Sequence, residues 1–320
     1  MKIIDLEAHF LTSTIMEFGE KRGNPVPKIQ PPKLADMLLD VGEKRQQMMT
    51  AAGIDMQVLS LVTPSLQMFE LVEGYEWSQR INDELSVIVK QYPDKYIGLA
   101  SVAPQDPDSA VKEIDRAVTK LGLKGICLLS HAQNEYLDNK KYWGIFEQAE
   151  KLDVPVYIHP STPSTAILKA FIDYGYPFSG PALGFAADTS VHVMRLIYSG
   201  LFDAHPNLKI ILGHMGEGLP FWLPRLDFAW NAWWIWQKPA IQKKPSECLK
   251  TNFWINTSGL FFQPALQCAY QSLGADRIMF GVDYPYQLND EAAQFMKEAD
   301  IPDGDKEKIL GLNAEKLFGL

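Results

Sequence analysis

Glu7 and His9, near the start of the chain, have the types and spacing of a pair of metal ligands. They follow an apolar run that predicts a first strand over Ile3–Leu6, so we expect them where that strand ends. Residues two apart on a strand point to the same face. A carboxylate oxygen and an imidazole nitrogen would then project side by side, as a divalent cation requires. Two ligands do not complete a site, so others must come from elsewhere in the chain.

Three further apolar runs end in a residue that can bind a metal. His159 ends a run in the middle of the chain, His214 follows Ile-Ile-Leu-Gly, and Asp283 follows Phe-Gly-Val. A single histidine at the end of a strand is usually a hydrogen-bonded structural residue. Together with Glu7 and His9, however, these residues place five candidate ligands at four strand ends, and this pattern predicts a metal site.

Short apolar, β-branched runs alternate with helical patterns along the whole chain, which is typical of parallel strands buried on both faces. The predicted strands are Ile3–Leu6, Gln57–Val62, Tyr96–Val102, Gly125–Leu129, Val154–His159, Lys209–Gly213, Phe253–Thr257 and Arg277–Val282. The predicted helices include Ala35–Ala52, Glu76–Gln91, Ser109–Leu121, Tyr142–Leu152 and Ser190–Leu201, with Thr189 as the cap of the last of these.

Eight such units predict a single α/β domain over residues 1–320, a (β/α)₈ TIM barrel. Functional side chains of a barrel come from the C-terminal ends of its strands, which is where the candidate ligands fall. A doubly wound open sheet is the alternative. It usually has a Gly-rich turn after its first strand, where this chain has Glu-Ala-His.

Two connections are longer than usual for this class of fold. They are Leu11–Lys33 after the first strand and Ser161–Asp188 after the fifth. We expect both at the C-terminal face as lids or pocket walls, with irregular surface packing as the alternative. The tail Pro302–Leu320 predicts a last helix that packs Ile309, Leu312 and Leu317 against the barrel.

Composition excludes several classes of protein. The net charge of −9 argues against a nucleic-acid partner. No window approaches the roughly 20 apolar residues of a membrane span, and the early strand leaves no room for a signal peptide. Three widely spaced cysteines, Cys127, Cys248 and Cys268, predict reduced thiols in a cytoplasmic protein.

Four motifs carry a resemblance to a known family. They are Leu6-Glu7-Ala8-His9-Phe10, Ile158-His159-Pro160, His214-Met215-Gly216-Glu217-Gly218-Leu219-Pro220 and Gly281-Val282-Asp283-Tyr284-Pro285. The chain resembles the amidohydrolase-related (amidohydrolase 2) metal-dependent decarboxylases and is most similar to γ-resorcylate and 2,3-dihydroxybenzoate decarboxylases. A Glu-x-His opening, in place of the His-x-His of classical amidohydrolases, points to the decarboxylase branch.

The resemblance implies one divalent metal ion, zinc or manganese, held by Glu7, His9, His159 and Asp283. A small aromatic acid such as a dihydroxybenzoate would chelate it, and Asp283 would protonate the ring carbon that bears the carboxylate. His214 and Glu217 would act beside the metal, with Glu217 orienting the imidazole. Glu217 could also serve as a carboxylate favoured near a helix N-terminus.

The same residues support a second reaction. If the metal holds a water molecule, Asp283 could act as general base and the site would hydrolyse an amide, ester or lactone. Many binuclear amidohydrolases place a bridging lysine at the end of the fourth strand, where this chain has Cys127-Leu128-Leu129-Ser130. This favours one metal but leaves a mononuclear hydrolase open. A non-catalytic binding protein is a third possibility, but its signature would be a lost ligand, and none is lost.

An aromatic segment after the sixth strand predicts contact with another subunit. Its rings do not fit a single buried stripe, so some should be covered by a partner. They are Phe221, Trp222, Trp230, Trp233, Trp234 and Trp236. We therefore expect a homo-oligomer, a dimer or tetramer, with an aromatic ligand platform as the alternative. The remaining histidines, His131, His192 and His205, are expected to be structural.

Overall fold

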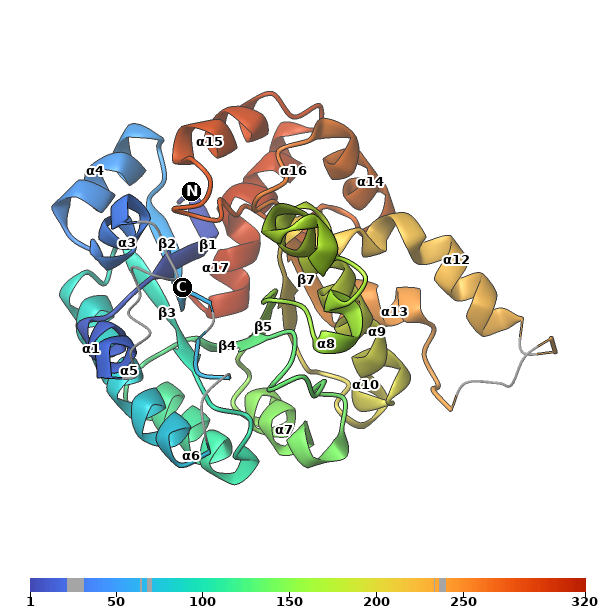
Figure 1. Cartoon of the computed structure of the whole chain (residues 1–320). Helices are drawn as coiled ribbons and strands as arrows, with labels where there is room; N and C mark the ends of the chain where they lie inside the picture. The colour runs from blue at the N-terminus through green and yellow to red at the C-terminus, as the bar shows by residue number, and fades with distance from the viewer. Residues whose placement is uncertain (22–31, 64, 68–70, 233, 236–239) are drawn as a thin grey trace.

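The computed structural model describes residues 1–21, 32–63, 65–67, 71–232, 234, 235 and 240–320. Its eight strands pair in parallel, in chain order, and form a (β/α)₈ barrel surrounded by helices (Figure 1). The strands are β1 (Ile4–Phe10), β2 (Met56–Leu61), β3 (Tyr96–Ser101), β4 (Gly125–Leu129), β5 (Val156–His159), β6 (Ile210–Leu212), β7 (Phe253–Asn256) and β8 (Ile278–Met279). Each overlaps one predicted run, so the predicted fold is confirmed and the open sheet is excluded.

The helices lie between successive strands. The connection after β1 contains α1 (Ser13–Lys21), α3 (Pro32–Leu39) and α4 (Glu43–Ala51). The connections after β2 and β3 contain one helix each, α5 (Leu71–Gln91) and α6 (Pro107–Thr119). The connection after β4 contains η1 (Lys140–Tyr142) and α7 (Trp143–Lys151). After β5 come α8 (Thr165–Leu168), η2 (Ile172–Tyr174), η3 (Phe178–Ala182), α9 (Gly184–Tyr198) and α10 (Leu201–Ala204). After β6 come α11 (His214–Glu217), α12 (Leu219–Asn231) and α13 (Pro245–Thr251), and after β7 α14 (Gln263–Leu273) and η4 (Ala275–Arg277). The chain ends with α15 (Asn289–Lys297), α16 (Asp303–Glu307), η5 (Lys308–Leu312) and α17 (Asn313–Phe318).

Two of the helix predictions were wrong in detail. The single helix predicted over Ala35–Ala52 is broken, because the carboxylate of Asp40 accepts hydrogen bonds from the main-chain nitrogens of Gly42 and Arg45 and starts α4 anew. Thr189 is not a cap, since α9 begins at Gly184 and Thr189 is buried inside it. Among the described residues, no helix has the length and apolar character needed to cross a membrane.

Two hydrophobic layers hold the barrel. The larger lies between the strands and the surrounding helices. The smaller fills the interior at the N-terminal ends of the strands, where Leu317 and Phe318 of α17 pack among Ile4, Leu6 and their neighbours. The end of the chain therefore closes the bottom of the barrel. Ile309 is buried as predicted, but Leu312 is 40% exposed, so its predicted packing was wrong.

The connection after β5 is long, as predicted, and contains the short helix α8, which Figure 1 shows in front of the strands. The buried carboxylate of Asp188 holds this connection in place. This carboxylate accepts hydrogen bonds from the hydroxyl groups of Ser130, Tyr136 and Ser164. Because Ser130 follows β4, one side chain ties together the loops that leave two neighbouring strands. The connection after β1 contains α1, and its residues 22–31 lie outside the described part of the chain.

The barrel closes between the end of β8 and β1, where a side chain completes the backbone pairing. The register between β1 and β2 shifts between Asp5 and Ala8, which indicates a bulge. Asp5 is fully buried there, and its Oδ1 accepts hydrogen bonds from the main-chain nitrogens of Glu7 (3.0 Å) and Val282 (2.8 Å). The bulge therefore lies directly beside the segment that leads to Asp283.

Candidate metal centre

Glu7 and His9 lie within β1 rather than at its exit. The strand continues to Phe10 because Ala8, His9 and Phe10 keep pairing with β2. The side chains of Glu7 and His9 are 0% and 1% exposed. The prediction that they face the same space was right, and the predicted end of the strand was too early.

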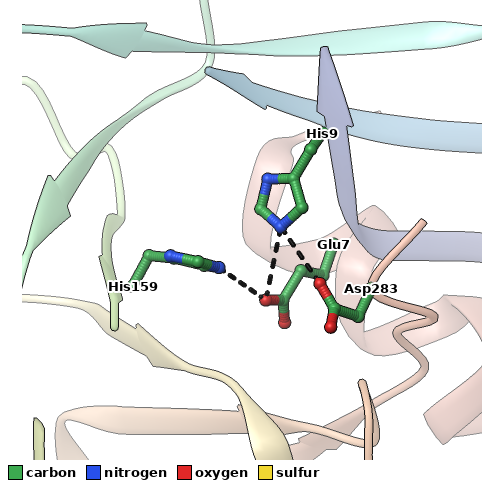
Figure 2. Close-up of side chains that lie close together, drawn as sticks. All are labelled: Glu7, His9, His159 and Asp283. Carbon is green, nitrogen blue, oxygen red and sulfur yellow. Dashed lines mark hydrogen bonds and ion pairs between the residues drawn. The ribbon is translucent and has the colours of Figure 1, made fainter. Parts of the chain in front are cut away.

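Figure 2 shows Glu7, His9, His159 and Asp283 converging from three parts of the barrel. One candidate ligand atom from each lies within 4.8 Å of the others. Glu7 Oε1 is 3.0 Å from His159 Nε2 and 3.8 Å from His9 Nε2, and His9 Nε2 is 3.1 Å from Asp283 Oδ1. The structure thus brings together the four residues that the resemblance implied as metal ligands.

The imidazole rings of His159 and His9 are oriented by partners of their Nδ1 atoms, on the side away from the other candidate ligands. His159 Nδ1 donates a hydrogen bond of 2.7 Å to the main-chain carbonyl of Pro160, which leaves its Nε2 facing Glu7. His9 Nδ1 lies 3.1 Å from the hydroxyl of Ser60. Partners of this kind fix the ring orientation of metal-binding histidines.

The four residues fit a divalent metal ion. Glu7 Oε1 and His159 Nε2 are buried and face each other at 3.0 Å, and neither has a further hydrogen-bond partner among the described residues. Buried polar atoms with so few partners are costly. Burial alone would raise the pKa of Glu7, but the charges of His214, His159 and His9 hold it below its usual range, so the carboxylate stays ionised. Two carboxylates and two imidazoles are a ligand set that suits zinc or manganese.

His214 and Glu217 lie beside this group on a left-handed turn. Residues 214–218 all have positive φ, between +49° and +79°, an arrangement that L-residues adopt only when their surroundings enforce it. His214 Nδ1 lies 2.7 Å from Glu217 Oε1, while its Nε2 is 3.6 Å from Glu7 Oε1 and 4.0 Å from Asp283 Oδ2. Burial opposes the charged imidazole, but the carboxylates of Glu217 and Glu7 raise the pKa of His214 to about 10.

The other histidines lie outside the metal group, which is the set Glu7, His9, His159 and Asp283. His131 accepts a hydrogen bond from the main-chain nitrogen of Asn134 and donates one to the carbonyl of Thr162. His205 pairs with Glu150 at 3.0 Å. His192 is fully buried in α9, and burial lowers its pKa to about 3. The contacts of His131 and His205 agree with the structural roles expected from the sequence, whereas the hydrogen bond expected for His192 is not found among the described residues.

Sequence reasoning missed a polar layer that supports the ligands. Arg45 is fully buried, and its guanidinium donates hydrogen bonds to the carbonyl of His9 and to Gln57. Tyr157 and Asn256 lie inside the barrel beside Glu7. Two signals were available: Tyr157 precedes His159 by two residues on a strand, and Asn256 ends an apolar run as His159 does. Arg45 gave no such signal, because it stands among the polar residues 43–47 of its helix.

Comparison with known proteins identifies relatives along the whole chain. Residues 4–320 match the family model described as Amidohydrolase. The γ-resorcylate decarboxylase of Polaromonas sp. strain JS666 is 36% identical over 326 residues, which cover 99% of this chain and 98% of that enzyme. These matches confirm the resemblance inferred from the motifs.

Solved structures give the same result. The 5-carboxyvanillate decarboxylase of Sphingomonas paucimobilis has a TM-score of 0.94 and 36% identity, and the match covers 100% of this chain and 99% of that one. A dihydroxybenzoic acid decarboxylase from Polaromonas sp. JS666, solved with manganese and the inhibitor 2-nitroresorcinol, has a TM-score of 0.91 and 36% identity, with coverage of 100% and 97%.

Proposed function

Because the chain belongs to the amidohydrolase family, we propose that it is a metal-dependent carboxy-lyase that removes CO₂ from a small phenolic acid. The observation that carries this proposal is the convergence of Glu7, His9, His159 and Asp283, whose ligand atoms lie within 4.8 Å of one another. Relatives with this fold are named as decarboxylases of 5-carboxyvanillate and dihydroxybenzoate, and one holds manganese. We assign zinc or manganese to this site on those grounds.

When bound, the metal ion would supply Lewis-acid polarisation and a fixed template for the substrate carboxylate and a neighbouring oxygen. Glu7, His9 and His159 would hold the ion from the barrel interior, since their side chains are at most 10% exposed. Asp283 is 17% exposed, more than these three, and is therefore the ligand nearest to an incoming substrate.

Asp283 is the residue to which we assign proton transfer. In the proposed reaction its carboxylic acid form gives a proton to the ring carbon that bears the substrate carboxylate. The bond from that carbon to the carboxylate then breaks, its electron pair restores the aromatic ring, and CO₂ leaves. A proton from water restores Asp283, so each CO₂ released consumes one proton.

We propose that His214 binds a substrate oxygen through Nε2. Glu217 accepts the Nδ1 proton at 2.7 Å, which fixes the ring and leaves Nε2 beside Glu7 and Asp283. An imidazole held in this way is oriented before substrate arrives, so it loses little orientational freedom when substrate binds.

A substrate screen tests this function. Purified protein loaded with manganese or zinc is mixed with 2,6-dihydroxybenzoate, 2,3-dihydroxybenzoate, salicylate and 5-carboxyvanillate, and CO₂ release is measured. We expect at least one phenolic acid to lose CO₂ without an organic cofactor. Turnover of lactones, esters or amides alone would replace the carboxy-lyase with a hydrolase. Binding of phenolic acids without turnover would indicate a binding protein.

We also propose that the chain forms a homo-oligomer, a dimer or tetramer, through α12 and the residues after it. Phe221, Trp222 and Trp234 are 69%, 54% and 67% exposed, and large apolar patches seldom stay in water. Figure 1 shows α12 extending away from the barrel. Trp230 packs partly against the core, and Trp233 and Trp236 lie outside the described residues.

Light scattering on the purified protein tests this assembly. We expect a mass of two or four chains, and a lower mass for Trp222→Glu. A monomer at micromolar concentration would overturn the proposal.

We propose a reducing, cytoplasmic location because the three cysteines are free thiols. Cys127, Cys248 and Cys268 are all free, and the first two are buried. Cell fractionation should recover the protein with cytoplasmic markers, and recovery from a secreted fraction would contradict the proposal.

A further inference from the structure

We propose that Asn256 is a positioning residue that couples the metal ligand Glu7 to His214. One arm runs from the Asn256 side chain through the Tyr157 hydroxyl to the carboxylate of Glu7. The other runs through Ser258 to the main chain of His214. The roles of Glu7 and His214 rest on the proposed function, whereas the contacts described below do not.

Asn256 lies beneath the metal group. It is the last residue of β7 and is 0% exposed, as are Tyr157 in β5 and Ser258 just beyond β7. Strand β6 lies between β5 and β7, so Asn256 and Tyr157 meet inside the barrel across that strand. Buried amide and hydroxyl groups are kept only where they find partners.

The first arm ends at Glu7. Asn256 Nδ2 donates a hydrogen bond of 3.3 Å to the Tyr157 hydroxyl, which leaves the phenolic proton for another acceptor. A Cβ placed on Gly213 would lie 2.8 Å from both Tyr157 Oη and Glu7 Oε2. The hydroxyl and the carboxylate oxygen therefore converge beside Gly213.

The second arm ends at His214. Asn256 Oδ1 accepts a hydrogen bond of 2.9 Å from the main-chain nitrogen of Ser258, and the Ser258 hydroxyl accepts one of 3.1 Å from the main-chain nitrogen of His214. His214 is the first residue of the left-handed turn, with φ of +49°. A backbone in this conformation needs fixed partners, and Ser258 supplies one.

Only asparagine or a close equivalent can serve both arms. Because the nitrogen of Ser258 can only donate, it must face Oδ1, which leaves Nδ2 toward Tyr157. The fit is tight, since a Cβ on Gly281 would lie 2.8 Å from Asn256 Oδ1. Aspartate would keep the acceptor and lose the donor, and alanine would lose both.

Two measurements without substrate test the proposal. The first is Mn²⁺ affinity by competition with a chelator. The second is the position of the His214 ring resonances in zinc-loaded protein labelled at histidine, assigned with a His214→Gln variant. Tyr157→Phe and Asn256→Asp should weaken Mn²⁺ binding about 10-fold or more and leave the His214 resonances in place. Ser258→Ala should shift those resonances with Mn²⁺ affinity unchanged, and Asn256→Ala should do both.

Asn252→Ala is the matched control. Asn252 is a buried asparagine just before the same strand and bonds to the carbonyls of Pro206 and Leu208 away from the metal group. It should lower stability without either effect. If Asn256→Ala folds but changes neither readout, or if Asn252→Ala reproduces both, the proposal is wrong. Failure of every phenolic acid to react would overturn the proposed function and leave these two readouts interpretable.

Discussion

The main-chain carbonyl of Glu7 accepts a hydrogen bond of 2.9 Å from the main-chain nitrogen of Asp283. The two carboxylate ligands are thus joined through backbone, although they come from opposite ends of the chain. Asp283 has φ of +76°, a left-handed conformation that aspartate tolerates better than most residues. This turn brings its side chain to His9. Glu7 therefore sets the position of the proposed acid in addition to its proposed role as a metal ligand.

Replacement of Asp283 by Asn should abolish decarboxylation and preserve the fold. The amide cannot give the proton that the ring carbon needs, so we expect turnover to fall about 10²- to 10⁴-fold or more. Activity and the far-ultraviolet circular dichroism spectrum are the measurements. Asp290→Asn, at an exposed aspartate of α15, is the control and should keep full activity. Equal activity of Asp283→Asn and wild type would remove Asp283 from the reaction.

Metal should stabilise the folded protein through His159. A ligand at 100 times its dissociation constant adds about 2.7 kcal/mol to the free energy of unfolding. Manganese at that ratio should raise the urea midpoint of the wild type, and a chelator should reverse the shift. His159→Ala should lose this response. His205→Ala removes the pair with Glu150 and the ring contact with Trp143, both outside the metal group, and should keep it. An identical metal response in both variants would show that His159 is not a ligand.

A methyl group at Gly259 should disturb His214. A Cβ there would lie 2.9 Å from His214 Cδ2, and the residue has φ of +61°. We expect Gly259→Ala to lower kcat well beyond any loss of stability. Gly200→Ala is a matched control, because Gly200 has φ of +86° but a Cβ added to it would meet no atom within 4 Å. It should carry a backbone cost of about 1–2 kcal/mol with kcat unchanged. Equal effects of the two variants on kcat would contradict the prediction.

His192 should make the protein less stable in mild acid. Burial lowers its pKa from 6.5 to about 3, and neither ring nitrogen has a hydrogen-bond partner in the described part of the chain. Between these values the unfolded chain binds a proton that the folded protein does not. The free energy of unfolding therefore falls as pH drops from 6.5 toward 3, by up to about 1.4 kcal/mol per pH unit from this residue. Urea unfolding at pH 7.5, 6 and 5 should show a flatter pH dependence for His192→Gln, and parallel profiles would contradict the assignment.

The chemistry of the site was predictable because it follows the periodic part of the sequence. His159 is the last residue of β5, and His214 comes two residues after Leu212, the last residue of β6. An apolar run that stops at a histidine or aspartate therefore located both the strand and its functional end. Barrel geometry then required these ends to meet.

The support around the site depends on contacts between distant segments, which periodicity does not encode. Asp5 completes the pairing between β1 and the end of β8, and this role appears only when both segments are in place. An aspartate inside a predicted strand was the available signal, since strands seldom contain it. Arg45 reaches His9 from a helix whose start is set by Asp40, a local cap that the helical pattern concealed.

The closure between β8 and β1 has a consequence for synthesis of the protein. His9 and Asp283 are 274 residues apart in sequence. A ribosome that adds 5–20 residues per second needs roughly 15–55 seconds to span that distance. During this interval the nascent chain contains Glu7 and His9 without Asp283, and its first strand lacks one neighbour. The proposed metal group, and with it the final seam of the barrel, can therefore form only after Asp283 has been synthesised.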